Sequence, residues 1–202
     1  MKSLLIATLN PGKLKEIETV YANSGITLKN LKDFSEVPLV EETGVTFEEN
    51  AILKAKYYFE KTGLPTLGDD GGLMVDALGG EPGVKSHRFL GYNANEVELA
   101  EAIIERLKDT PKEKRTAHLG GVIAFWDGEH LIQTENFVAG YIVEELKEKP
   151  SPGFPYRAIL FIPEFNKIYQ DFTQEEYAKI NHRYQNLISL KPEIIKHLSG
   201  KS

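Results

Sequence analysis

The chain has 202 residues, a formal net charge of −6 and no cysteine. This length suits one domain, or two closely joined lobes, with a sizeable core. The lack of Cys excludes disulfides, a thiol nucleophile and Cys-based metal sites, and the negative charge argues against duplex nucleic acid as a partner. No run approaches the roughly 20 apolar residues of a membrane span, and no cleavable leader is evident, so a cytoplasmic protein with no membrane partner is expected.

The N-terminal segment is typical of a strand, a turn and a helix. Residues 4–7 are apolar, residues 10–12 (NPG) have turn chemistry, and residues 14–21 have helical spacing. The amides at the start of this helix and the Lys13 ammonium could converge on phosphate oxygens. An ordinary strand-to-helix turn with a solvated Lys13 is the alternative.

Capping signals predict further helices. Thr46 and Glu49 have the spacing of a capping box, and a Gly63 stop predicts a helix that ends near Thr62. The same signal at Asn95 and the apolar positions after it predict a helix to about Leu107.

Two adjacent carboxylates, Asp69 and Asp70, follow a short strand predicted at residues 65–67. Sites in α/β sheets tend to form just beyond strand ends. Neighbouring carboxylates repel unless a cation such as Mg²⁺ compensates them. Glu41 and Glu42 form a second acidic pair, and solvated loops are the alternative for both pairs. Together with the possible phosphate-binding turn before the first helix, the two acidic pairs indicate metal-assisted attack of water on phosphorus.

The second half of the chain adds an antiparallel element and a final helical region. Residues 121–126 and 130–134 resemble a hairpin, and residues 147–155, with three prolines, predict an irregular loop. Helical signals resume at Thr173, which has the spacing of a capping box with Glu176, and they are interrupted at residues 181–183. The sheet is therefore expected to be mixed, in an α/β fold.

The interruption would expose the donors of His182 and Arg183. The alternative is that Arg183 pairs with a carboxylate while His182 packs in the core. The other histidines show no metal-ligand spacing, so none of them is expected to bind a metal: His87, His118, His130 and His197.

Three segments resemble, in order, the motifs of the inosine triphosphate pyrophosphatase family. Residues 8–13 resemble its T-G-N-x-x-K loop, residues 41–55 its E-E-T-G-x-T-F-x-E-N-A-x-x-K-A segment, and residues 69–84 its D-D-S-G-L signature with the P-G turn after it. The resemblance covers most of the chain and is loose over residues 93–148. It implies one domain over residues 1–202, an elongated α/β fold of two lobes around a long mixed sheet flanked by helices, a site in the cleft between the lobes, and a homodimer.

The resemblance also implies Mg²⁺-dependent hydrolysis of ITP, dITP and XTP to the monophosphate and pyrophosphate. Asp70 corresponds to the general base with Asp69 as its acidic catalytic neighbour, and Glu41 and Asp70 correspond to the metal ligands. His182 and Arg183 match a motif whose donors read the purine 6-oxo group. The implied substrate-binding residues are Thr8, Asn10, Gly12, Lys13, Lys54, Gly71, Arg88, Phe154, Tyr156, Arg157, Tyr177, His182 and Arg183.

The chain departs from the family pattern at positions of base recognition. Residues 154–158 are FPYRA where the family has F-G-Y-D-P, so Arg157 replaces a carboxylate. Tyr177 stands where a Lys is common, and Gly71 replaces a Ser or Thr. Because a reversed charge can alter selectivity, a different modified nucleotide is one alternative substrate. A nucleotide-binding protein without turnover is the other alternative.

Overall fold

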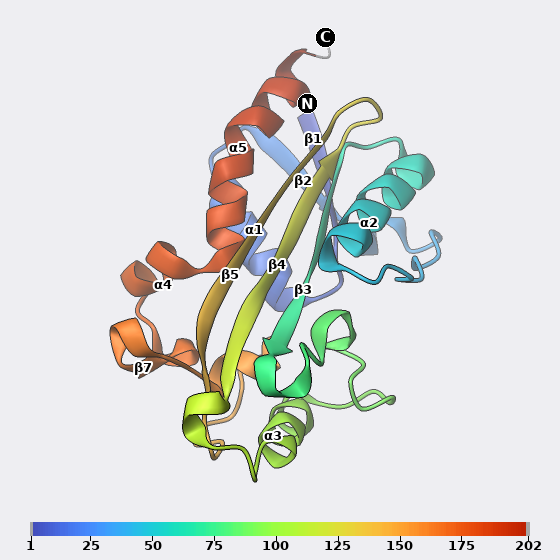
Figure 1. The fold of residues 1–202 in the computed structure, drawn as a ribbon. Helices are drawn as coiled ribbons and strands as arrows, with labels where there is room; N and C mark the ends of the chain where they lie inside the picture. The colour runs from blue at the N-terminus through green and yellow to red at the C-terminus, as the bar shows by residue number, and fades with distance from the viewer. Residues whose placement is uncertain (1, 201–202) are drawn as a thin grey trace. The chain divides into compact units, whose positions relative to one another are not determined.

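The structure is a computed structural model that describes residues 2–200 and contains a seven-stranded sheet with helices around it (Figure 1). The strand order across the sheet is β2 (Ile26–Asn30), β1 (Lys2–Ala7), β3 (Thr66–Val75), β4 (Thr116–Trp126), β5 (Leu131–Ile142), β6 (Leu160–Ile162) and β7 (Lys167–Ile168). β1 pairs in parallel with β2 and β3, whereas β6 pairs antiparallel with β5 and β7. The expected α/β class with a mixed sheet is confirmed.

The α-helices are α1 (Pro11–Tyr21), α2 (Phe47–Thr62), α3 (Glu96–Arg106), α4 (Gln174–Ile180) and α5 (His182–Gly200). The predicted capping boxes at Thr46, Asn95 and Thr173 are all present, and Gly63 ends α2 in the left-handed conformation. The predicted interruption is also confirmed, because Asn181 separates α4 from α5. Among the described residues, no helix is long and apolar enough to cross a membrane.

The chain divides into two compact units. The first comprises Met1–Asp70, Gly121–Asn136 and His182–Ser202, and the second comprises Gly71–Gly120 and Phe137–Asn181. Strands β3, β4 and β5 each contribute residues to both units.

In the first unit, alternate residues of β1 face different helices. Leu4 and Ile6 are buried in a cluster with side chains of α1 and α5. Leu5 and Ala7 are buried in another cluster with Tyr58 of α2. Since successive strand side chains point to opposite faces, α1 and α5 cover one face of the sheet and α2 covers the other.

The approach of β3 to α2 is close because position 68 is a glycine. A Cβ on Gly68 would lie 2.0 Å from the carbonyl oxygen of Ala51. Because Gly68 has no side chain, α2 lies directly against β3 at Ala51. The buried face of α2, which includes Asn50 and Lys54, is thereby brought close to the next residues of β3.

The prediction of a short strand at residues 65–67 with the acidic pair beyond its end is wrong. β3 continues to Val75, so Asp69 and Asp70 lie in the middle of a strand. The glycine pair after them is typical of a turn, but Gly72 is needed for packing, because a Cβ there would lie 2.0 Å from the Ser86 hydroxyl oxygen. Strand geometry therefore directs the two carboxylates to opposite faces.

The second unit has its own hydrophobic core, built on α3 and the second halves of β3 and β5. Its buried residues include Leu73, Leu99, Ile103 and Tyr169. The predicted irregular loop ends at Pro155, which begins a short 3₁₀ turn, Pro155–Ala158. The predicted hairpin is present and longer than expected, since β4 and β5 are neighbours in the sheet.

Candidate functional site

Asp69 is the centre of a buried charge network on the α1 and α5 face of the first unit. Its Oδ1 accepts a hydrogen bond from Lys13 Nζ at 2.7 Å. Arg183, in the first turn of α5, donates to both carboxylate oxygens of Asp69 through Nε and Nη2. Arg183 Nη1 donates to Glu16 Oε2 at 2.8 Å. The alternative of a solvated Lys13 is therefore wrong, and the alternative of a carboxylate-paired Arg183 is confirmed.

The surroundings of Asp69 keep its side chain ionised. Burial by itself raises the pKa of this carboxyl, but the nearby Arg183 and Lys13 outweigh burial and hold its pKa far below the ordinary value. Burial lowers the pKa of Lys13, and Asp69 offsets this only in part. The pKa of Arg183 is raised, because Asp69 and Glu16 outweigh the effect of its burial. Asp69 is thus suited to holding cations and not to accepting a proton.

Asp70 belongs to a second network, on the α2 face. Lys54 Nζ donates to its Oδ1 at 2.9 Å, and Asn50 Nδ2 donates to its Oδ2 at 3.2 Å. Lys54 also lies 3.0 Å from Glu42 Oε1 and donates to a carbonyl of β3. The amide of Gly44 donates to Asn50 Oδ1 at 2.8 Å. Asn50 therefore connects Asp70 to the loop that follows Glu41 and Glu42.

The pKa of Asp70 is raised, because burial penalises its ionised form more than the nearby Lys54 and Lys13 favour it. Burial acts to lower the pKa of Lys54, but Asp70 and Glu42 outweigh burial and raise it. A buried carboxyl with a raised pKa beside a charge partner is a candidate general base. The two adjacent aspartates therefore have opposite proton affinities.

Two residues of these networks were missed from the sequence, Glu16 and Asn50. Glu42 was noticed as half of an acidic pair but was not assigned a role of its own. The signal for Asn50 was its spacing, since Asn50 and Lys54 are four residues apart on the buried side of α2. Within the acidic pair, the half-buried Glu42 contacts Lys54, whereas the predicted ligand Glu41 is exposed.

Residues 8–13, the segment predicted to bind phosphate, are arranged as a helix cap. Asn10 Oδ1 accepts hydrogen bonds from the amides of Gly12 and Lys13 at 2.9 and 3.1 Å, and Thr8 Oγ1 accepts one from the Asn10 amide at 3.1 Å. These two amides, which were predicted to bind phosphate, are thus bonded to Asn10. The Lys13 ammonium and the positive end of the α1 dipole supply the positive charge here.

In the second unit, the Arg157 side chain is buried against aromatic rings. Its guanidinium carbon lies 3.5 Å from the ring centre of Phe154, 5.0 Å from that of Tyr177 and 5.4 Å from that of Tyr169. Cation–π attraction and the planar shape of guanidinium favour such stacking. The charge reversal noticed in the sequence therefore places a cation on the face of a predicted base-contacting aromatic.

The remaining predicted substrate-binding residues have varied surroundings, and their roles stay predictions. Tyr156 is in the core of the second unit and donates to the Ser86 carbonyl at 2.6 Å. Arg88 is exposed, and Gly71 is half-buried on β3. His182 is buried at the start of α5 in the first unit.

The Asp69 network predicts a large loss of stability on neutralisation. Replacing Asp69 by Asn leaves Lys13 and Arg183 short of a buried countercharge, and breaking such a pair costs about 3–5 kcal/mol. Chemical denaturation at pH 7 measures this change. Because the folded-state pKa is depressed, the stability from Asp69 is present above about pH 4 and is lost as the pH falls. Asp69→Asn should lack this acid-dependent component.

The exposed Asp109→Asn provides the matched control, which should change stability by no more than about 0.5 kcal/mol. Equal stabilities of the Asp69 and Asp109 variants would contradict a dominant role for the buried network.

Comparison with known proteins shows which family the chain resembles over its length. The model of the Ham1 family matches residues 4–193. The chain is 37% identical over 203 residues to a dITP/XTP pyrophosphatase of Geobacillus kaustophilus, covering 100% of this chain and 98% of that protein. It is 38% identical over 191 residues to a dITP/XTP pyrophosphatase of Bacillus subtilis, covering 94% and 96%.

Solved structures agree. The structure of a HAM1 protein from Coxiella burnetii matches with a TM-score of 0.84 and 30% identity, covering 98% of this chain and all of that one. The Ham1 protein of Staphylococcus aureus matches with a TM-score of 0.81 and 29% identity over the full length of both chains. The resemblance to the inosine triphosphate pyrophosphatases is therefore confirmed, and this chain belongs to the Ham1 family.

Proposed function

We propose that this chain hydrolyses inosine, deoxyinosine and xanthosine triphosphates to the monophosphate and pyrophosphate. The observation that carries the proposal is Asp70, a buried carboxyl with a raised pKa in the middle of β3, in a chain similar over its full length to dITP/XTP pyrophosphatases. Asp69, Asp70 and the lysine and arginine side chains that contact them provide the acidic and cationic groups that such a reaction needs.

Asp70 is the proposed general base. It takes a proton from water as the water oxygen forms a bond to phosphorus and the bond from phosphorus to the bridging oxygen breaks, which releases pyrophosphate. A raised pKa suits this task, because a base acts best when its pKa approaches the working pH. The hydrogen bonds from Lys54 and Asn50 orient the carboxylate.

The acidic residues of the site favour a divalent cation. Asp69, Asp70, Glu16 and Glu42 are four carboxylates that face three cations, Lys13, Lys54 and Arg183. Negative charge is thus in excess even before the exposed Glu41 is counted. Carboxylate oxygens are the ligands that Mg²⁺ prefers. By the family resemblance, Glu41 and Asp70 are the proposed ligands. When bound, Mg²⁺ supplies neutralisation of phosphate charge.

Lys13 is the better of the two lysines for holding phosphate. An ammonium group has three protons to donate. Lys54 is within 3.0 Å of three acceptors, so phosphate must displace one of them. Lys13 has one short contact, to Asp69, and a second at 3.5 Å. Thr8, Asn10, Gly12 and Lys54 belong to the same proposed phosphate-binding set. Arg88 of the second unit is a further proposed substrate-binding residue.

The base-recognition residues form two groups, one in each unit. By the family resemblance, His182 and Arg183 of the first unit are proposed to read the 6-oxo group. In the second unit, Phe154, Tyr156, Arg157 and Tyr177 are the proposed base-contacting residues, with Gly71 beside Asp70 in sequence.

Asp70→Asn tests the proposed base. The amide cannot accept the proton of water, so kcat should fall by about 10²–10⁴-fold. Pyrophosphate release with Mg²⁺ should be measured on a panel of ITP, dITP, XTP, ATP and CTP, on which the wild-type chain should favour the three 6-oxo purines. Because the base must be ionised, wild-type activity should fall as the pH drops through the pKa of Asp70.

Asp33→Asn provides a matched control, since Asp33 lies in a short 3₁₀ turn after β2 and outside both charge networks. Turnover that survives in folded Asp70→Asn would remove Asp70 from the role of base. Tight nucleotide binding by the wild type with no product would instead favour the alternative of a binding protein.

Arg157→Asp tests the origin of selectivity. Arg157 covers a face of Phe154, so removal of the guanidinium frees an aromatic surface for a base and restores the family carboxylate. We expect the KM for ITP to fall by about tenfold or more, the gain of one good contact of about 1.4 kcal/mol. Arg157→Lys keeps the charge and loses the planar stack, which separates these two contributions.

Unchanged ITP kinetics in both folded variants would exclude Arg157 from base selection. A preferred substrate that carries an additional negative group, lost in Arg157→Asp and kept in Arg157→Lys, would favour the alternative of a different modified nucleotide.

By the same family resemblance we propose a homodimer that acts in the cytoplasm on the free nucleotide pool. Sedimentation equilibrium of the purified chain tests the dimer, and the mass of a single chain at micromolar concentration would refute it.

A further inference from the structure

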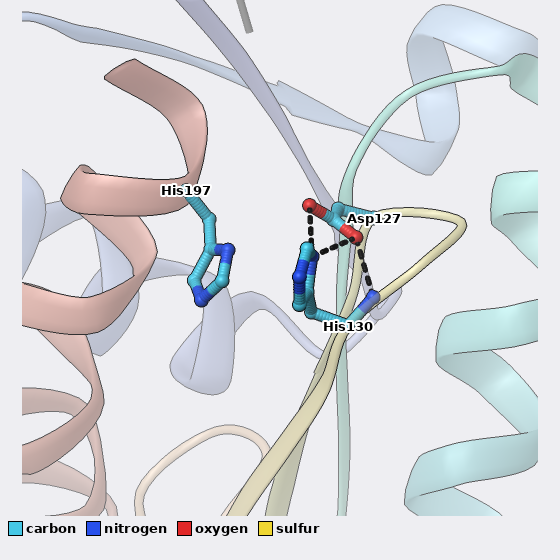
Figure 2. Close-up of side chains that lie close together, drawn as sticks. All are labelled: Asp127, His130 and His197. Carbon is cyan, nitrogen blue, oxygen red and sulfur yellow. Dashed lines mark hydrogen bonds and ion pairs between the residues drawn. The ribbon is translucent and has the colours of Figure 1, made fainter. Parts of the chain in front are cut away.

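Three side chains of metal-ligating type converge in the first unit where β4 turns into β5 (Figure 2). Asp127 directly follows β4, His130 directly precedes β5, and His197 comes from the C-terminal part of α5. One ligand atom from each residue lies within 4.8 Å of the others.

The Asp127 carboxylate is buried and held by the backbone. Its Oδ1 accepts hydrogen bonds from the amides of Glu129 at 3.0 Å and His130 at 2.8 Å, and its side chain is only 1% exposed. The His130 Nδ1 lies 3.4 Å from the same carboxylate. The turn thus holds the carboxylate in place through Oδ1, and the His130 imidazole lies beside both of its oxygens.

The two imidazoles lie against each other beside this carboxylate. Their ring centres are 4.2 Å apart, with a tilt of 41°. The Phe125 ring lies 6.3 Å from that of His197 and provides an apolar side. The His130 side chain is 43% exposed, so an ion and water can reach the group from solvent. Glu193 Oε2, at 4.0 Å from His197 Nε2, is a further carboxylate within reach.

An ordinary turn accounts for part of this arrangement. Aspartate side chains commonly bond to amides two and three residues ahead of them, which explains Oδ1. It does not explain why His197, from the C-terminal part of α5, lies with its ring 4.2 Å from that of His130 and with a ring nitrogen within 4.8 Å of ligand atoms of Asp127 and His130. A carboxylate with two imidazoles is the donor set of divalent zinc-type ions and not of Mg²⁺, which prefers oxygen ligands.

We propose that Asp127, His130 and His197 bind one divalent transition-metal ion of the Zn²⁺ type, with water or Glu193 as the fourth ligand. Zn–N distances of about 2.0–2.1 Å require ligand atoms about 3.3 Å apart, so side-chain rotation must bring the present atoms closer. The bound ion fastens the end of α5 to the β4–β5 turn. The sequence predicted no metal at His130 or His197.

The test compares four tag-free proteins: the wild type, His130→Gln, His197→Gln and the control His87→Gln, which changes an exposed histidine of the second unit. Zn²⁺ binding is measured by calorimetry, and Co²⁺ binding by visible absorption. One equivalent should bind to the wild type and the control, with affinity at least about tenfold weaker in the other two variants. Thermal unfolding should shift upward with Zn²⁺ only where the site is intact.

A second measurement, an NMR titration with Zn²⁺, uses the wild type alone. One equivalent of Zn²⁺ should shift the ring C–H resonances of His130 and His197 in NMR spectra and leave those of His87 unchanged. No stoichiometric binding by the wild type, or equal affinity in all four proteins, would overturn the proposal. These readouts are independent of nucleotide hydrolysis.

Discussion

The structure of the site depends on one constraint: two adjacent carboxylates in a buried strand must each find a positive partner on its own side. Asp69 and Asp70 are consecutive residues of β3 and therefore face opposite ways. Asp69 meets Lys13 and Arg183 at the starts of α1 and α5, and Asp70 meets Lys54 of α2. Because a buried charge without a partner is very costly, the strand and three helices of the first unit are fixed together by these pairs.

The same arrangement separates two chemical tasks. Asp69 has two cationic partners and a depressed pKa, so it stays ionised and orients Lys13 and Arg183. Asp70 has one close cation, and burial dominates its surroundings and raises its pKa. Environments that push the pKa values of neighbouring acids apart are a means of assigning distinct roles in catalysis. In the proposed reaction, one aspartate holds the site together while the other moves a proton.

Much of the fold could be predicted from local signals. Capping boxes at Thr46, Asn95 and Thr173 report local hydrogen bonds and located three helices correctly. The extent of β3 could not be predicted in this way. The glycines after Asp70 are typical of a turn, but the strand continues through them, and Gly72 packs closely against Ser86, a tertiary contact that local signals do not report.

The candidate site was predictable in its residue types and only partly in its contacts. The motifs identified Lys13, Lys54, Asp69 and Asp70, which the structure brings into two networks. They did not indicate that Asn50 fastens the acidic loop or that Glu42 contacts Lys54, because both contacts depend on how that loop folds back on α2. The sequence did not indicate the group of Asp127, His130 and His197, because only the fold brings His197 of α5 beside the turn that holds the other two.

The most direct test of this account is the titration of the two aspartates, followed by NMR of their carboxyl carbons in the wild-type chain. The account predicts that Asp70 titrates above the ordinary value of about 3.9 for an aspartate, while Asp69 remains ionised to the lowest pH at which the chain stays folded. Titration of both carboxyls together near the ordinary value would contradict it.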